Sequence, residues 1–279
     1  MTDPTEGEYP HADLSLARRI ELMEGIINSG FVEARAELFP QTGAAWIRVC
    51  GGYSLFDGPH SPVTQTFGLG LFDEVTDGHL DEIEAFYFDR NTDVNLEVCP
   101  LPNHQLHLKL SQRGYDPIEL TSILYRPVSD VMVGRLSLNP SLRVRRLEPD
   151  EAMTWAAVAA EGWREFGEMD DLFREVARIS MLRADTHLFV AELDGHPIAA
   201  GVLGVYDGVL YLAGACTIPS ARRQGAQLAL LDSRLNFGAR NGCDIAVMGA
   251  PPGSSSQRNA ERHGFRVAYT RIKWQLKKS

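Results

Sequence analysis

An internal repeat is the feature that most constrains how this chain of 279 residues can fold. At an offset of 150 residues, the segment 57–115 aligns with the segment 207–265 without a gap. Because turn signals and the ends of helical patterns coincide in the two segments, we predict a duplicated structural unit. The identical positions are Asp57/Asp207, Gly58/Gly208, Leu80/Leu230, Arg90/Arg240, Asn91/Asn241, Pro102/Pro252 and Gly114/Gly264.

The apolar patterns of the second copy predict the order of elements for both. Apolar runs at 188–193, 198–206 and 209–218 are separated by turn signals and indicate strands. Leucines recur at helical spacing after Gly225 and indicate an amphipathic helix. The remaining elements are expected in this order: that helix at 225–240, a strand at 244–248, a helix at 254–263 and strands within 265–276.

This order predicts an α/β chain of the α+β type with mixed sheets. We expect two domains in tandem, each a mostly antiparallel twisted sheet flanked by helices. The predicted domains are 1–130 and 141–279, since Gly134, Asn139 and Pro140 interrupt the pattern between them.

A strand, a basic turn and a helix start follow one another at 210–227. The strand ends before Pro219, and Arg222 and Arg223 precede Gly225. Free N–H groups at a helix N-terminus bind diphosphate well, and glycine lets the backbone approach it closely. Arginines are electrostatically unfavourable at a helix N-terminus unless an anion binds there, so we favour a diphosphate site over a solvated helix start.

The same segment resembles the cofactor signature of the GNAT superfamily of acyl-CoA-dependent N-acyltransferases. That signature is R-x-x-G-x-[GA] after a strand that ends in an apolar residue, any residue and proline. Here Thr217-Ile218-Pro219 precedes Arg222-x-x-Gly225-x-Gln227, and Gln227 stands where glycine or alanine is usual. The helix closed by Gly264-Phe265 is similar to the second cofactor-contacting element of the family. The resemblance covers 142–279, with a weaker copy at 14–127.

The resemblance implies two GNAT-like domains in tandem and an N-acetyltransferase. It implies that acetyl-CoA, or another acyl-CoA, is the co-substrate, and that a primary amine of a small molecule or peptide attacks the thioester directly. The main chain at the strand end would hold the thioester arm. The cofactor-binding residues that it implies are Thr217, Ile218, Arg222, Arg223, Gln224, Gly225, Ala226, Gln227 and Asn259.

The first copy is expected not to bind the cofactor. At the offset of 150, the basic loop aligns with residues 72–77, which contain Asp73, Glu74 and Asp77 and no equivalent of Gly225. A helix start with these acids would repel a diphosphate. We therefore expect the first copy to be degenerate, with one acetyl-CoA bound per chain.

The general acid of the reaction is not evident. Many GNAT members have a tyrosine where this chain has Ala260. Ser254 and Tyr269 are the candidate replacements for protonating the thiolate, although a serine at a helix start is also a typical N-cap. Glu165 or Glu168 would take the ammonium proton, directly or through water, and Glu168 is the catalytic candidate.

The resemblance implies an acceptor wall at 161–171, because the segment between the first two helices commonly forms this wall in the superfamily. Trp163, Glu165 and Phe166 are the candidate substrate-binding residues, and aromatic and acidic side chains suit a cationic or aromatic amine. The structural alternative is a helix–loop–helix with the aromatic rings in the core and the acids in solvent.

Composition limits the other partners. A net charge of −10 argues against nucleic acid, which needs a surplus of Lys and Arg. The cysteines and histidines show no metal-ligand spacing, so no metal is predicted. No apolar run is long enough to span a membrane, and the acidic start is not typical of a targeting signal, so we expect a cytoplasmic protein; a homodimer is left open.

Two further functions remain as alternatives to a small-molecule acetyltransferase. The missing tyrosine and the degenerate first copy also suit a regulatory or scaffolding module that binds acyl-CoA without turnover. A protein acetyltransferase acting on lysine or an N-terminus is the other alternative.

Overall fold

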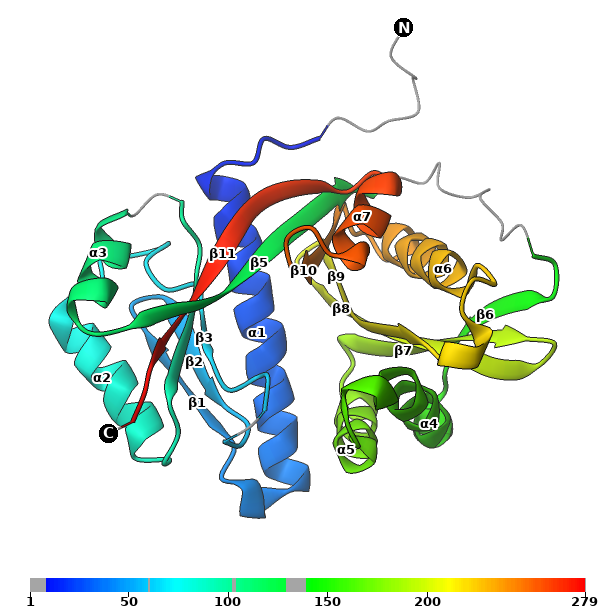
Figure 1. Cartoon of the computed structure of the whole chain (residues 1–279), viewed down its shortest axis with the longest axis horizontal. Helices are drawn as coiled ribbons and strands as arrows, with labels where there is room; N and C mark the ends of the chain where they lie inside the picture. The colour runs from blue at the N-terminus through cyan, green and yellow to red at the C-terminus, as the bar shows by residue number, and fades with distance from the viewer. Residues whose placement is uncertain (1–8, 60, 102–103, 129–138, 279) are drawn as a thin grey trace, which may run out of the picture. The chain divides into compact units, whose positions relative to one another are not determined.

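Figure 1 shows the computed structural model of the chain, which describes residues 9–59, 61–101, 104–128 and 139–278. The chain divides into two compact units. Within the described residues, unit 1 is Pro127–Val247, and unit 2 combines Tyr9–Arg126 with Met248–Ser279.

In unit 1 the strand order is β6-β7-β8-β9-β10. Neighbouring strands are antiparallel, except that β9 and β10 are parallel. Helix α6 lies on one face of this sheet, and α4 and α5 lie on the other (Figure 1). The bounds are β6 Leu142–Arg146, α4 Ala152–Trp163, α5 Asp170–Met181, β7 Thr186–Leu193, β8 His196–Tyr206, β9 Val209–Thr217, α6 Ala226–Arg240 and β10 Ile245–Ala250, whose last residues fall in unit 2.

The core of unit 1 is formed where α4 packs on the sheet. Trp155 and Ala159 of α4 are buried against Leu188, Val190 and other apolar residues of the strands. A Cβ at Gly162 would lie 2.6 Å from the sulfur of Cys216, so this helix approaches β9 closely enough to require glycine there.

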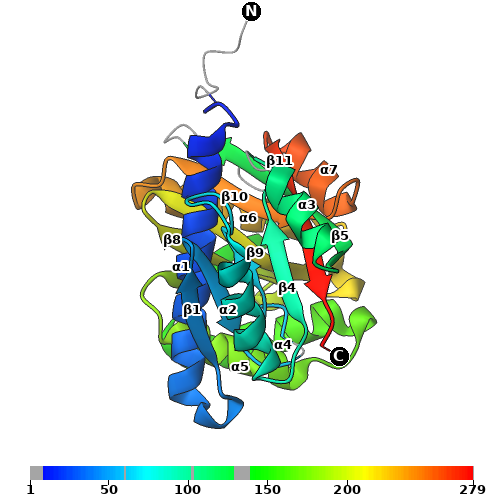
Figure 2. The same ribbon diagram turned by 90° about the vertical axis from the view of Figure 1, so that its left-hand side faces the viewer.

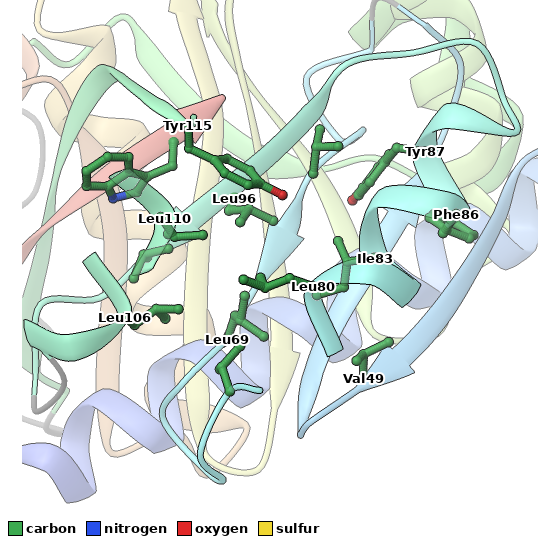
Figure 3. Packing of buried hydrophobic residues seen from close by; sticks show 14 of the residues in the cluster. Val49, Leu69, Leu80, Ile83, Phe86, Tyr87, Leu96, Leu106, Leu110 and Tyr115 are labelled. Atoms are coloured by element: carbon green, nitrogen blue, oxygen red, sulfur yellow. The ribbon is translucent and has the colours of Figure 1, made fainter. Parts of the chain in front are cut away.

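In unit 2 the strand order is β1-β2-β3-β4-β11-β5. Helix α1 covers one face, where it packs on Tyr53 and Leu55, and Figure 2 shows α1 alongside these strands. Helices α2 and α3 cover the other face, whose core is drawn in Figure 3. The bounds are α1 Leu14–Leu38, β1 Ala45–Val49, β2 Gly52–Phe56, β3 Thr66–Phe67, α2 Asp77–Phe88, β4 Val94–Val98, α3 His104–Gln112, β5 Asp116–Pro127, α7 Ser255–Arg262 and β11 Arg266–Leu276.

The last strand of the chain lies inside the sheet of unit 2. β11 pairs antiparallel with β4 on one side and with β5 on the other. β5 and β11 are equivalent in the repeat, and Arg266 lies opposite Tyr125 while Gln275 lies opposite Asp116, so the equivalent strands meet about a pseudo-twofold axis. The predicted division at 130–141 places 248–278 with the second domain, whereas these residues pack with the first half of the chain. The physical reason is the pairing of β11 with β4 and β5, which places the last strand of the chain in the sheet of unit 2.

A buried charged cluster joins β11 to α1 within unit 2. Arg271 Nη1 lies 2.8 Å from Glu24 Oε2 and 3.4 Å from Glu21 Oε2, and Arg271 Nε lies 3.5 Å from Glu97 Oε2. The Tyr269 hydroxyl donates to Glu21 Oε1 at 2.8 Å. Burial raises the pKa of Glu21 to about 7, although the charge of Arg271 acts in the opposite direction. The cluster therefore links the final strand of the chain to α1 and β4 within unit 2.

The fold class predicted from the sequence is confirmed, and the predicted elements of the second copy lie within a few residues of the observed ones. Asp207-Gly208 is the tight turn between β8 and β9. Asp57-Gly58 instead starts a longer connection to β3, in which Asp57 is buried, ion-paired with Arg35 at 2.9 Å and bonded through its N–H to the Thr64 hydroxyl at 2.9 Å. The predicted interruption at Gly134 lies outside the described residues.

Candidate functional site

The end of β9 presents main-chain groups on the side away from β8. The Ile218 N–H donates to the Ile198 carbonyl of β8 at 2.9 Å. Because main-chain directions alternate along a strand, the N–H and C=O of Thr217 point away from β8. Within unit 1, β9 pairs with β10 at Val209–Tyr211 and then continues to Thr217. Of the two residues predicted to hold the thioester arm, Thr217 has the suitably directed main chain.

The loop between β9 and α6 has the backbone shape of an anion site. Arg223 and Gly225 both adopt positive φ, at 66° and 87°. Helix α6 starts at Ala226 without a side-chain cap among the described residues and without an acid in its first turn. Its first intrahelical bond runs from the Ala229 N–H to the Gly225 carbonyl at 3.0 Å, which leaves the preceding N–H groups available. This combination suits a diphosphate.

Two helix starts, that of α2 at the equivalent place in the first copy and that of α7, are capped by side chains. The Thr76 hydroxyl accepts from the His79 N–H at the start of α2, and Asp77 stands in its first turn. The Ser254 hydroxyl accepts from the Gln257 N–H at 3.1 Å at the start of α7. The repeat thus pairs an uncapped basic helix start in the second copy with a capped acidic one in the first.

Gln227, which departs from the GNAT signature, folds back onto the strand. Its Nε2 donates to the Thr217 hydroxyl at 2.8 Å. This contact joins the first turn of α6 to the last residue of β9. The main-chain N–H of Gln227 remains at the helix start, where the signature needs an amide rather than a particular side chain.

Arg222 lies in an ion pair with the segment predicted as the acceptor wall. Its Nη2 lies 2.7 Å and its Nη1 3.3 Å from the two carboxylate oxygens of Glu165. Both side chains are about half exposed, at 45% and 48%. The hydrogen bond from Arg222 lowers the pKa of the Glu165 carboxyl. The sequence pattern does not signal this pair, because its members are far apart in the chain.

The other acceptor candidates are spread along the connection between α4 and α5. Trp163 is the last residue of α4 and packs against the core of unit 1. Glu168 is exposed. The backbone of Phe166 lies in the short 3₁₀ turn after α4, and its side chain is outside the described part.

The two general-acid candidates belong to unit 2. Ser254 is the N-cap of α7, which is the structural role considered for it from the sequence, and Asn259 is exposed on the same helix. Tyr269 is buried, and its hydroxyl is bonded to Glu21. Burial raises the pKa of Tyr269 well above its ordinary value, and the neighbouring Glu21 charge adds to this effect. These surroundings oppose release of its proton.

Cys216 lies next to the candidate site but has the environment of a core residue. Its pKa is raised to about 11 by burial, so the reactive thiolate is disfavoured. Among the residues that the structure describes, no group of His, Cys, Asp and Glu side chains could hold a metal ion. No described helix is long and apolar enough to cross a membrane.

Comparison with solved structures defines the class of fold. The chain is similar to a GCN5-related N-acetyltransferase from Kribbella flavida, with 16% identity, a TM-score of 0.65 and coverage of 95% of this chain and 96% of that one. It is also similar to a tandem GNAT protein from the clavulanic acid biosynthesis pathway, with 9% identity, a TM-score of 0.59 and coverage of 96% and 97%. At these identities the likeness shows the fold, which is that of tandem GNAT proteins.

The family assignment rests on the second half of the chain. Residues 150–265 match the Acetyltransferase (GNAT) family, so this part of the chain is a GNAT acetyltransferase domain. A protein of unknown function from Staphylococcus epidermidis also shares the fold, with 10% identity, a TM-score of 0.62 and coverage of 88% and 98%. A search of curated proteins finds no match.

Proposed function

We propose that the chain is an acyl-CoA-dependent N-acyltransferase that transfers an acetyl group to a primary amine of a small molecule or peptide. The observation that carries the proposal is the uncapped basic start of α6 directly after β9. Arg222, Arg223 and the N–H groups from Gly225 to Gln227 would hold the diphosphate of acetyl-CoA. The residues present fit this group because the helix start has N–H groups to donate and no acid to repel it.

The end of β9 supports the placement of the acyl group. The main chain of Thr217 points away from β8 and is able to hydrogen-bond the thioester arm. Bound acyl-CoA supplies an activated thioester carbonyl, which a neutral amine attacks without a covalent enzyme intermediate. Cys216 takes no part, since burial keeps its thiol protonated.

For the acceptor side, we propose Glu165 and Glu168 as the carboxylates that bind the ammonium group and accept its proton. Both are exposed at the connection between α4 and α5, as an acceptor site requires. A cationic amine suits this pair of acids. Trp163 contributes to the wall from the end of α4.

A non-catalytic acyl-CoA-binding module is the second candidate, and a specific observation favours it. Ala260 replaces the usual tyrosine, Tyr269 is buried against Glu21, and Ser254 already caps α7. A reaction without a protein general acid requires solvent or the acceptor to protonate the thiolate. The two candidates therefore differ in turnover and not in cofactor binding.

The test combines calorimetry with an assay for free CoA. Acetyl-CoA is expected to bind with a stoichiometry of one per chain, and CoA release is expected to depend on an added amine from a library. Binding without amine-dependent release would support the non-catalytic module. No binding at all would refute both candidates.

A further inference from the structure

A bulge in β9 lies just before the candidate thioester-binding residue. The β8–β9 pairing runs Ala200 opposite Cys216, but Val202 opposite Ala213. Gly201 on β8 therefore faces two residues of β9, one of which, Gly214, adopts a φ of +55°. A bulge inserts one extra residue into a strand and increases its local twist.

The extra residue determines which way Thr217 faces. One inserted residue reverses the alternation of main-chain directions in the rest of the strand. With the bulge, Ile218 bonds to β8 and Thr217 points away from it. Without it, and with the upstream register kept, Thr217 would turn its N–H and C=O toward β8. The bulge is thus a requirement of the proposed thioester contact.

Side chains from both helical layers hold the bulge. From α4, the Trp155 Nε1 donates to the Gly201 carbonyl at 3.1 Å. From α6, the Arg234 Nη1 donates to the carbonyls of Val202 and Ala213 at 3.1 and 3.3 Å. Bulges interrupt the regular ladder, and buried carbonyls need donors, so these contacts stabilise the irregular geometry.

Arg234 is an unusual residue for a core. It is 4% exposed, and among the described residues it makes hydrogen bonds to carbonyls but no ion pair with a carboxylate. Burial lowers the pKa of its guanidinium to about 10. A buried charge without a counter-ion is costly, and an apolar side chain would fill the same volume more stably. Two of its hydrogen bonds go to the carbonyls of Val202 and Ala213, directly beside the bulge.

We infer that Arg234 and Trp155 are positioning residues that hold the β9 bulge and thereby direct the main chain of Thr217 toward the acyl thioester. The inference rests on the proposed acyl-CoA function. It concerns the geometry of the reacting carbonyl and not the diphosphate site. Loss of either donor should therefore lower kcat far more than it weakens acetyl-CoA binding.

The test uses Arg234→Met, Arg234→Lys and Trp155→Phe, with Arg240→Met as the control on an exposed position at the end of α6. Arg234→Met and Trp155→Phe are expected to lower kcat at least roughly tenfold while the Kd of acetyl-CoA changes less than about threefold. Arg234→Lys should restore part of kcat, because an ammonium group can still donate to a carbonyl. If Arg234→Met and Trp155→Phe lower the melting temperature but keep kcat, Arg234 and Trp155 are structural residues and the inference is wrong.

Amide hydrogen exchange separates this inference from the proposed function. In Trp155→Phe and Arg234→Met, the Ile218 N–H, which is bonded to β8, should exchange faster than in wild type, with or without activity. If wild type shows no acetyl-CoA binding, the proposed function fails whatever the exchange shows. If exchange at the Ile218 N–H is unchanged in both variants, Trp155 and Arg234 do not hold the bulge.

Discussion

The carboxylate of Glu165 accepts hydrogen bonds from both terminal nitrogens of Arg222, at 2.7 and 3.3 Å. One residue belongs to the predicted acceptor wall and the other to the predicted diphosphate loop. A diphosphate bound at α6 would compete with Glu165 for the same guanidinium. Binding of the diphosphate would therefore weaken this ion pair, which links the proposed diphosphate loop to the proposed acceptor wall.

Glu165→Gln should strengthen acetyl-CoA binding. The substitution removes the competing charge, and exposed pairs of this kind are weak, so we expect a decrease in Kd of about twofold to fivefold. Calorimetry at low ionic strength measures the effect, which should shrink in high salt. Glu168→Gln is the matched control on the same connection. Weaker binding in Glu165→Gln would show that Glu165 orients Arg222 rather than competing for it.

Gln227→Ala should separate stability from cofactor binding. The substitution removes the hydrogen bond to the Thr217 hydroxyl, worth about 0.5–1.5 kcal/mol, and so should lower the melting temperature by a few degrees. The main-chain N–H at the helix start remains, so the Kd of acetyl-CoA should change less than about threefold. Gln112→Ala, on an exposed position at the end of α3, is the control. A large loss of affinity would mean that the Gln227 side chain itself contacts the cofactor.

The sequence predicted most elements of the second copy of the repeat because its signals are local. Turn signals such as Asp207-Gly208, apolar periodicity and the ends of α6 and α7 are all set within a few residues. The basic loop could be found for the same reason, since Arg222 and Gly225 are neighbours in the chain.

Contacts between distant segments could not be predicted in the same way. Arg271 is buried only because α1 and β4 supply carboxylates from the other end of the chain. The bulge at Gly214 depends on donors from α4 and α6, and neither Trp155 nor Arg234 belongs to a recognisable motif. Tyr269 is a site candidate in the sequence because it follows α7, whereas its bond to Glu21 depends on tertiary packing.

Arg271→Met should strongly destabilise the protein. Removing this guanidinium leaves the carboxylates of Glu21, Glu24 and Glu97 buried without their shared cation, which typically costs about 3–5 kcal/mol. Urea unfolding measures the change. Lys277→Met, on the exposed end of the chain after β11, is the control and should stay close to wild type. An unchanged unfolding midpoint in Arg271→Met would show that β11 does not depend on the cluster.

The raised pKa of Glu21 predicts a pH dependence of stability. Its pKa is about 7 in the folded state against 4.5 for an ordinary glutamate, so the folded state binds more protons between these values. The contribution of this group to the unfolding free energy must therefore fall as pH rises from about 5 to 8. Glu21→Gln cannot titrate and should remove that slope, whereas the exposed Glu82→Gln should retain it. Parallel slopes for wild type and Glu21→Gln would contradict the assignment.

The last prediction tests the diphosphate loop itself through Gly225 and Arg222. Gly225 has a φ of 87°, and a Cβ there would meet its nearest atom, in Leu142, at 3.6 Å. Space is therefore available, and the obstacle to Gly225→Val is backbone conformation, since a β-branched residue is strongly disfavoured at positive φ. We expect the loop to change shape and acetyl-CoA binding to fall at least roughly tenfold.

Arg222→Ala should have a smaller effect of a different kind. It removes one half-exposed charge from the loop, so the KM for acetyl-CoA should rise about threefold to tenfold, with a dependence on salt and little change in kcat. Gly195→Val is the matched control for Gly225→Val, because Gly195 has a similar φ of 82° in the β7–β8 turn, and a Cβ at this position would meet no atom within 4 Å. Gly195→Val places a valine in the same unfavourable backbone conformation, but outside the loop. Circular dichroism checks that all variants are folded. If folded Gly225→Val and Arg222→Ala both bind acetyl-CoA like wild type, the loop is not the diphosphate site and the proposed function fails with it.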